Sequence, residues 1–159
     1  MKDFEDIYNA YAKQVFRICL GYTNDADKAK DLVQETFISV WKNLSSFENR
    51  SLMTTWIFRI ATNNCLRHLE IEKRKERTLL PSNLMLDDTT GKEDQIQFLY
   101  KCISELAETD RIIISLDLEE LPQAEIAAIV GLSHSTIRVR VHRIKDKLKQ
   151  KFQEHGQFS

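Results

Sequence analysis

The stretch from Gln123 to Lys151 restricts the fold of this chain more than any other, because it contains two helical patterns separated by a single turn. The first pattern runs over Ala124–Val130, and Gly131 then supplies a residue that readily ends a helix. Ser133 can cap a second helix with one apolar stripe. This stripe consists of Ile137, Val141, Ile144 and Leu148. The spacing predicts a helix-turn-helix, in which two helices meet around a tight turn.

The second of these predicted helices is strongly basic. Residues 134–151 contain seven Lys and Arg residues against one Asp, a net charge of +6. Such a helix suits a phosphate backbone, although a solvated cationic helix at the edge of a bundle has the same pattern. Ala127 is small enough for a close helix crossing, and Gly131 follows four residues later. This combination favours a helix pair that presents its second helix to the DNA major groove.

The rest of the chain is predicted to be helical as well. Only four Gly and two Pro residues interrupt 159 residues, and no sustained alternation of apolar and polar residues indicates a strand. No run approaches the ~18 apolar residues of a membrane span, and the acidic, polar first residues do not resemble a signal peptide. We therefore expect an all-α protein that stays in the cytoplasm, without direct membrane insertion.

The helical patterns fall into two groups, which predict two small helical domains. The first group contains three predicted helices. They cover residues 4–22, the segment that begins after its expected N-cap Asn24, and residues 52–76. From Lys73 the pattern dissolves into clustered charges with a Pro and a Gly, and it resumes near Glu93. We predict one domain over residues 1–76 and a second over residues 93–159, joined by a flexible linker over residues 77–92.

The cysteines and histidines argue against an enzyme or a metalloprotein. Cys19, Cys65 and Cys102 lie far apart in apolar helical stretches, so we expect buried, reduced thiols. No histidine has the spacing of a zinc ligand, and no carboxylate pair lies on an apolar helix face. We therefore expect no catalytic residue, no metal, no cofactor and no small-molecule substrate.

Two rows of polar residues stand out in the first domain. The apolar stripe of the second predicted helix includes Trp41, and its polar edge consists of Asp31, Gln34 and Glu35. Such an edge by itself indicates only a solvated surface. The third predicted helix carries a row spaced by four, namely Arg59, Asn63 and Arg67. An Arg/Asn row suits contact with bases and phosphates, and it is also common on exposed helices.

Three segments together resemble the signature stretches of the extracytoplasmic-function sigma factors, the short two-domain initiation subunits of bacterial RNA polymerase. They are AKDLVQETFISVW (residues 29–41), TWIFRIATNN (residues 55–64) and the helix-turn-helix (residues 125–148). Their order and spacing match the family from about residue 4 to residue 151. The resemblance implies a sigma2-like N-terminal domain for core polymerase and the -10 element, and a sigma4-like C-terminal domain for the -35 element. It also implies no catalysis by this chain.

The resemblance assigns roles to individual residues. The core-binding set, which would dock on the clamp helices of the largest polymerase subunit, is Asp31, Leu32, Gln34, Glu35 and Phe37. The residues that match the stretch facing the melted non-template strand of the -10 element are Trp56, Arg59 and Asn63. Arg67 completes the row as a further -10 candidate, although it stands where the family usually has an Asp, so the -10 sequence preference of the family does not carry over. The set that would face the -35 element is Ser135, Thr136, Arg138, Val139, His142, Arg143 and Lys145. Val139 replaces a residue that is often small and polar in the family, which favours contact with a thymine methyl group.

The resemblance implies core RNA polymerase and promoter DNA as partners, and a membrane-associated anti-sigma factor as a third. The linker is rich in apolar residues and residues 87–125 carry a net charge of −8, which together suit closure of the two domains around another protein. The alternative function is a stand-alone helix-turn-helix regulator that binds a palindromic operator as a dimer. Such a regulator would have no use for the polar edge at Asp31 or for a strand-binding row.

Overall fold

The computed structural model describes residues 3–48, 52–76 and 92–155. Within these ranges the chain forms seven α-helices and one 3-10 turn, without a strand. The elements are α1 (Phe4–Thr23), α2 (Ala26–Asn43), η1 (Leu44–Ser46), α3 (Met53–Glu76), α4 (Lys92–Ser104), α5 (Glu108–Leu118), α6 (Gln123–Val130) and α7 (His134–Glu154). The predicted all-α class is therefore confirmed. No helix in the described ranges is long and apolar enough to cross a membrane.

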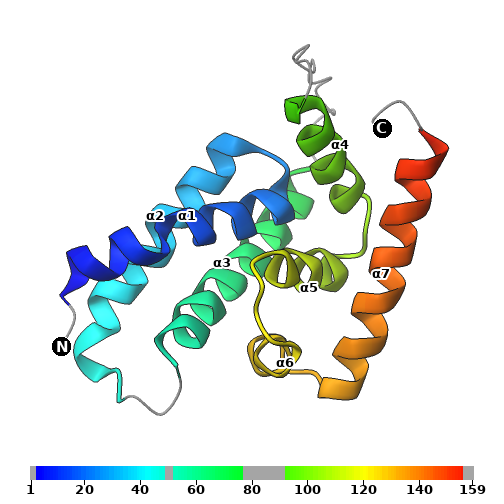
Figure 1. Cartoon of the computed structure of the whole chain (residues 1–159). Coiled ribbons are helices and arrows are strands. Elements are labelled where there is room, and N and C mark those ends of the chain that lie inside the picture. Colours follow the sequence, from blue (N-terminus) through cyan, green and yellow to red (C-terminus); the bar gives the residue numbers. More distant parts are fainter. Residues whose placement is uncertain (1–2, 49–51, 77–91, 156–159) are drawn as a thin grey trace.

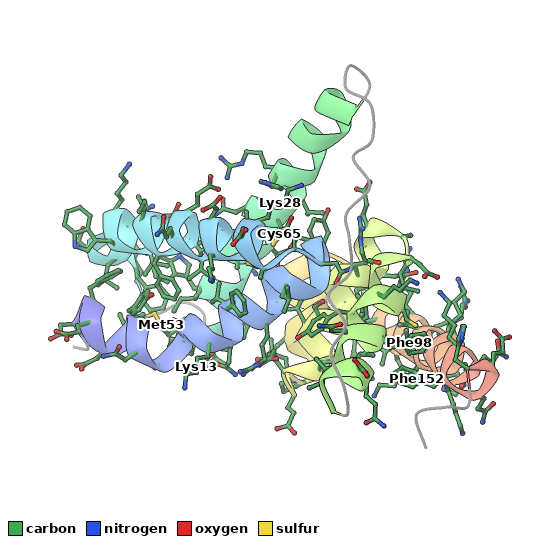
Figure 2. All side chains as sticks on the ribbon, turned by 90° about the horizontal axis from the view of Figure 1, so that it is seen from above. Lys13, Lys28, Met53, Cys65, Phe98 and Phe152 are labelled. Atoms are coloured by element: carbon green, nitrogen blue, oxygen red, sulfur yellow. The ribbon has the colours of Figure 1, made fainter. Side chains whose placement is uncertain are left out.

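Helices α1, α2 and α3 form an N-terminal bundle in which each helix packs against the other two (Figure 1). Cys65 lies inside this bundle (Figure 2), with its sulfur 3.7 Å from the sulfur of Cys19. The hydrogen bond to Cys19 and burial raise the pKa of the Cys65 thiol well above its ordinary value, which keeps it neutral. Both residues and Cys102 are buried free thiols, as the sequence predicts.

The junction of α1 and α2 differs from the sequence prediction of Asn24 as an N-cap. Asn24 is instead the C-cap of α1, in the left-handed conformation (φ 52°), and its N–H donates to Leu20 O. Asp25 caps α2, because its carboxylate accepts the backbone N–H groups of Asp27 and Lys28. Asn tolerates left-handed backbone better than most residues, so it suits the end of one helix as well as the start of another.

Helices α4 to α7 form the C-terminal domain, and its helix-turn-helix is confirmed. Gly131 ends α6 in the left-handed conformation (φ 77°), and the Ser133 hydroxyl caps α7 by accepting the N–H of Thr136. The predicted stripe of α7 is buried, and α5 packs against both helices of the motif. At the other end of α7, the rings of Phe98 and Phe152 meet edge-on with centroids 4.9 Å apart (Figure 2).

The two domains pack against each other (Figure 1). Helix α1 contacts α4 and α5, and α3 contacts α6. Gly21 lies where α1 crosses α5, and a Cβ at this position would overlap the hydroxyl of Ser115. The two helices therefore approach closely only because residue 21 has no side chain. The predicted linker over residues 77–92 lies outside the described residues, apart from Lys92.

Gly131→Ala is expected to lower the free energy of unfolding by about 1–2 kcal/mol, the cost of left-handed backbone for an ordinary residue. A Cβ at this position would meet no atom within 4 Å, so the loss comes from the backbone conformation and not from a clash. Urea unfolding measures the change. Gly131→Asn is the matched control and should lose less, because Asn tolerates this conformation; equal losses for Ala and Asn would contradict the explanation.

Candidate nucleic-acid interface

The outward side of α7 carries the residues predicted to face the -35 element. Burial of the Ile137–Leu148 stripe against α5 and α6 turns the intervening positions toward solvent. All seven residues of the set are exposed except Thr136, which is half-buried. A shallow hollow of about 330 Å³ lies on this side, and its walls are Ser135, Thr136, Val139, Arg140 and Arg143. The first three turns of α7 therefore expose hydroxyl groups, an apolar side chain and guanidinium groups, all of which a partner could contact.

Ion pairs divide the basic residues of α7 into two groups. Three of them are paired with acids that lie on α5 or just before it. The pairs are Lys145–Asp117 (Nζ–Oδ2 3.1 Å), Arg140–Asp110 (Nη1–Oδ1 3.5 Å) and Lys151–Glu105 (Nζ–Oε2 2.7 Å). Arg138 and Arg143 have no ion pair within the described part of the chain. Part of the acidic segment 87–125, which the sequence analysis expected to contact other proteins, thus forms ion pairs inside the C-terminal domain, on one side of α7.

His142 and Asp146 form a further pair along α7. His142 Nε2 lies 3.4 Å from Asp146 Oδ2, and both side chains are mostly exposed. The imidazole therefore remains accessible from solvent. A histidine in this position can donate a hydrogen bond to a base or a phosphate from its accessible face.

The four residues predicted for the -10 strand lie on α3 in different environments. Trp56 is half-buried, and its ring packs on Phe47 with centroids 4.7 Å apart. Arg59 Nη2 donates to Ala128 O of α6 (3.0 Å), and Arg67 Nη2 donates to Asn64 Oδ1 (2.6 Å). Asn63 is exposed and makes no side-chain hydrogen bond within the described residues. Asn63 is therefore the member of the row whose polar side chain is most accessible to a ligand.

The polar edge of α2 is exposed, but two residues of the predicted core-binding set are not. Asp31, Gln34 and Glu35 face solvent. Leu32 and Phe37 are 0% and 3% exposed, and both belong to the core of the N-terminal bundle. Leu32 is enclosed in the core and can orient α2, whereas Phe37 keeps a small exposed part.

An apolar groove adjoins the polar edge, and the sequence prediction did not include it. The groove has a volume of about 400 Å³ and is lined by Phe4, Tyr8, Gln34, Phe37, Ile38 and Trp41. Trp41, predicted to lie in the buried stripe, is instead 64% exposed, and Ile38 is 53% exposed. Trp41 follows Gln34 by seven residues, which is two helical turns, so it shares the face of the polar edge. The seven-residue spacing from Gln34 is the feature of the sequence that indicates the exposure of Trp41.

Comparison with known proteins covers both domains. The family model for sigma-70 region 2 matches residues 7–75, and the model for sigma-70 region 4 matches residues 97–148. The RNA polymerase sigma factor YlaC of Bacillus subtilis (strain 168) is 28% identical, over 92% of this chain and 90% of its own. The ECF RNA polymerase sigma-E factor of Salmonella typhimurium (strain LT2) is 29% identical, over 96% and 87% of the two chains.

A solved structure resembles the whole arrangement. It is the sigma factor RpoE from Bartonella quintana, in a co-crystal with the anti-sigma factor NepR. The two chains are 26% identical and superpose with a TM-score of 0.80, over 94% of this chain and 96% of the other. The similarity therefore includes the two domains and the way in which they pack.

Proposed function

The chain belongs to the extracytoplasmic-function sigma factors of the sigma-70 family, and from this membership we propose how its surfaces divide promoter recognition. It is a promoter-recognising factor whose partners are core RNA polymerase and promoter DNA. We assign core polymerase and the -10 element to residues 1–76, the linker to residues 77–92, and the -35 element to residues 93–159. The exposed outer side of α7, held in place by its buried stripe, is the observation that carries the proposal.

The core-binding surface is proposed to consist of the polar edge of α2 and the adjoining groove. Protein interfaces commonly have an apolar centre with a polar rim. Ile38 and Trp41 supply such a centre, and Asp31, Gln34 and Glu35 supply its rim. Leu32 acts from below by fixing the position of α2, and Phe37 lines the groove itself. Exposed tryptophans are frequent among the residues that dominate binding energies, so Trp41 extends the set assigned from the sequence.

The -10 surface is proposed to lie along α3. Recognition of a melted strand requires stacking surfaces for bases and polar side chains for their edges. The Trp56 ring is fixed by Phe47 and is still partly open, and Asn63 offers both a donor and an acceptor. Arg59 and Arg67 supply positive charge on the same side of the helix. Asn63 is therefore the best candidate to hold a base that leaves the duplex.

The -35 surface is proposed to be the N-terminal half of α7. Ser135 and Thr136 lie at the start of the helix, where hydroxyl and backbone N–H groups favour a phosphate. Arg138 and Arg143 are exposed and suited to guanine or phosphate, and Val139 to a thymine methyl group. His142 and Lys145 complete the set, with Lys145 partly neutralised by Asp117.

Several further properties follow from this assignment. A sigma factor contributes binding and leaves catalysis to the polymerase, so we propose that the chain is not an enzyme and has no catalytic residue. It would act in the cytoplasm, where the polymerase acts. The related RpoE chain is bound to an anti-sigma factor, and we propose a partner of that kind for this chain. A stand-alone regulator is disfavoured, because a sigma-70 region 2 domain precedes the helix-turn-helix.

Run-off transcription with purified core polymerase tests the proposed function. A library of genomic fragments serves as template, and transcripts are sequenced with and without the chain. We expect a set of start sites that appears only with the chain and that shares paired upstream motifs. The absence of such transcripts, together with dimeric binding to a palindromic duplex, would support the regulator instead.

The salt dependence of DNA binding should distinguish two neighbouring lysines of α7. Lys147 is exposed on the basic helix α7 and has no ion pair among the described residues, so we propose that it contacts a phosphate. Lys147→Ala is then expected to lower the slope of log affinity against log salt by roughly one unit, because a phosphate contact releases about one counterion. Lys145→Ala should change the slope less, since Asp117 already holds its ammonium at 3.1 Å. A duplex of random sequence suffices, because phosphate contacts are independent of sequence. A larger change for Lys145 than for Lys147 would contradict this account.

A further inference from the structure

A chain of hydrogen bonds connects α3 with α2 inside the N-terminal bundle. Arg67 Nη2 donates to Asn64 Oδ1 (2.6 Å), and Asn64 Nδ2 donates to Thr36 Oγ1 (3.4 Å). The Thr36 hydroxyl in turn donates to Leu32 O (2.7 Å). Thr36 is 0% exposed and Asn64 is 5% exposed, whereas Arg67 faces solvent. The chain therefore begins at the proposed -10 surface and ends on the backbone of the helix that carries the polar edge.

The donors and acceptors of this chain follow one direction, which fixes the orientation of the Asn64 amide. A guanidinium donates and does not accept, so the amide oxygen has to face Arg67. The NH2 group of the amide then faces the Thr36 oxygen, whose own proton is donated to Leu32 O. Hydrogen bonds in series polarise and strengthen one another. The orientation of the Arg67 guanidinium is thus linked to the backbone of α2.

Residue 64 lies at a position where packing alone favours an apolar side chain. Asn64 follows Ile57 by seven residues and Ala61 by three, and both of these are 0% exposed. A buried amide is unfavourable unless it is hydrogen-bonded, and a Leu of similar size needs no partner. Asn64 is therefore not required for packing. Its distinctive contribution is a fixed acceptor beside an exposed guanidinium.

Arg67 keeps donors for a ligand while Asn64 holds it. A guanidinium carries several N–H groups in a planar fork, and the bond to Asn64 uses Nη2. Arg67 follows Asn63 by four residues, so the two side chains lie on one face of α3. A planar fork matches the geometry of a phosphate, which every nucleotide of a strand offers. A guanidinium that is already held also loses less conformational entropy when it binds.

We propose that Asn64 is a positioning residue, which holds the Arg67 guanidinium in place for a phosphate of the melted strand, next to the base held by Asn63. The fixed orientation of Arg67 is inferred from the hydrogen bonds alone. Its contact with the strand rests on the proposed function. Each of these two parts has its own measurement.

Nuclear magnetic resonance tests whether Asn64 holds Arg67. The variant is Asn64→Leu, which removes the amide and leaves the Thr36 hydroxyl with its backbone acceptor. In ¹⁵N relaxation, the Arg67 Nε–Hε group should be ordered in the natural chain and mobile in the variant. Arg17 is the reference in the same spectra, because its Nε donates to Glu119 (2.8 Å), a bond that does not involve residue 64.

Thr36→Val supplies a second way to loosen Arg67. Val has a shape similar to that of Thr, but it offers no acceptor to the Asn64 NH2 group. Thr36 is 0% exposed, so the substitution cannot remove a direct contact with DNA. The mobility of Arg67 should rise less than in Asn64→Leu, because the bond between Arg67 and Asn64 remains possible. Unchanged mobility of Arg67 in both variants would overturn the proposal, whatever the effect on DNA.

Binding of single-stranded DNA tests the role of Arg67. The probe is a fluorescent oligonucleotide of random sequence, because phosphate contacts carry no sequence information. Arg67→Ala should weaken binding about ten-fold, as expected for a lost hydrogen bond to a charged group, and should lower the salt slope by about 0.7. Asn64→Leu should weaken binding about three-fold, because the guanidinium then has to be ordered on binding. Normal binding by Arg67→Ala would overturn the contact with the strand and remove Arg67 from the -10 set.

The double variant separates positioning from a general effect on the bundle. If Asn64 acts through Arg67, Asn64→Leu should cause no further loss once Arg67→Ala is present. Equal losses with and without Arg67 would mean that residue 64 acts on the whole bundle, and would overturn the proposal. Circular dichroism and urea unfolding measure whether the variants stay folded. Failure of the proposed function itself would appear separately, as a lack of promoter-specific run-off transcripts while Arg67 is still ordered by Asn64.

Discussion

Glu35→Lys is expected to lower the affinity of the chain for core RNA polymerase by about 30-fold, which corresponds to ~2 kcal/mol. Glu35 is exposed on the polar edge of α2, so the substitution leaves the buried core of the bundle untouched. A reversed charge inside a complementary interface replaces attraction by repulsion and commonly costs several kcal/mol. Titration of labelled chain with purified core polymerase measures the affinity, and circular dichroism measures the helical content.

Two further variants sharpen this test. Glu154→Lys makes the same charge change at an exposed residue near the end of α7, outside every assigned surface, and should bind core normally. Trp41→Ala removes the largest exposed apolar side chain of the groove and should weaken binding without changing the charge. If Glu35→Lys bound core as tightly as Glu154→Lys does, the α2 edge would lose its assignment.

Asn63→Ala is expected to reduce open-complex formation by about ten-fold or more, while binding to a closed -35 duplex stays unchanged. A side chain that holds an unstacked base acts only after the duplex opens, and loss of such a contact costs about 1–3 kcal/mol. Asn63 is exposed and makes no side-chain hydrogen bond in the described chain, so its removal should not disturb the fold. Permanganate reactivity of unpaired thymines reports the opening.

Arg138→Ala is the matched comparison for Asn63→Ala, and we expect it to show the opposite pattern of defects. Arg138 is exposed on α7, and loss of a two-point contact to guanine should cost about 1–3 kcal/mol and relax specificity at one base pair. Its defect should appear already in binding to the closed -35 duplex. Equal losses for both variants in both assays would falsify the proposed division between the domains.

The local pattern of residues was sufficient to predict the helices and the helix-turn-helix. The α7 stripe, Gly131 and Ser133 act within one or two turns of the chain, so their effect does not depend on the rest of the fold. The same periodicity correctly placed Asp31 and Glu35 on an exposed edge. Asn24 was misassigned because Asn and the following Asp25 can both cap a helix, and propensity alone does not choose between them.

Which apolar residues stay exposed was decided by tertiary packing. The stripe of α2 is wider than the surface that α1 and α3 cover, so Val40 is buried while Trp41 remains open beside the groove. Pairing of Lys145 with Asp117 likewise depends on how α5 lies against α7, and no spacing along the sequence indicates it.

The contacts between the domains are the part of the structure that the sequence left undetermined. Arg17 and Glu119 are 102 residues apart, and Arg59 and Ala128 are 69 apart. Helical periodicity relates residues three or four positions apart, so it determines the faces of each helix and leaves open which faces meet. Local residue patterns were therefore sufficient to predict the helices, the two domains and the family. The packing of one domain on the other could not be predicted in this way, because it depends on the shapes of the helix surfaces and on ion pairs between distant parts of the chain.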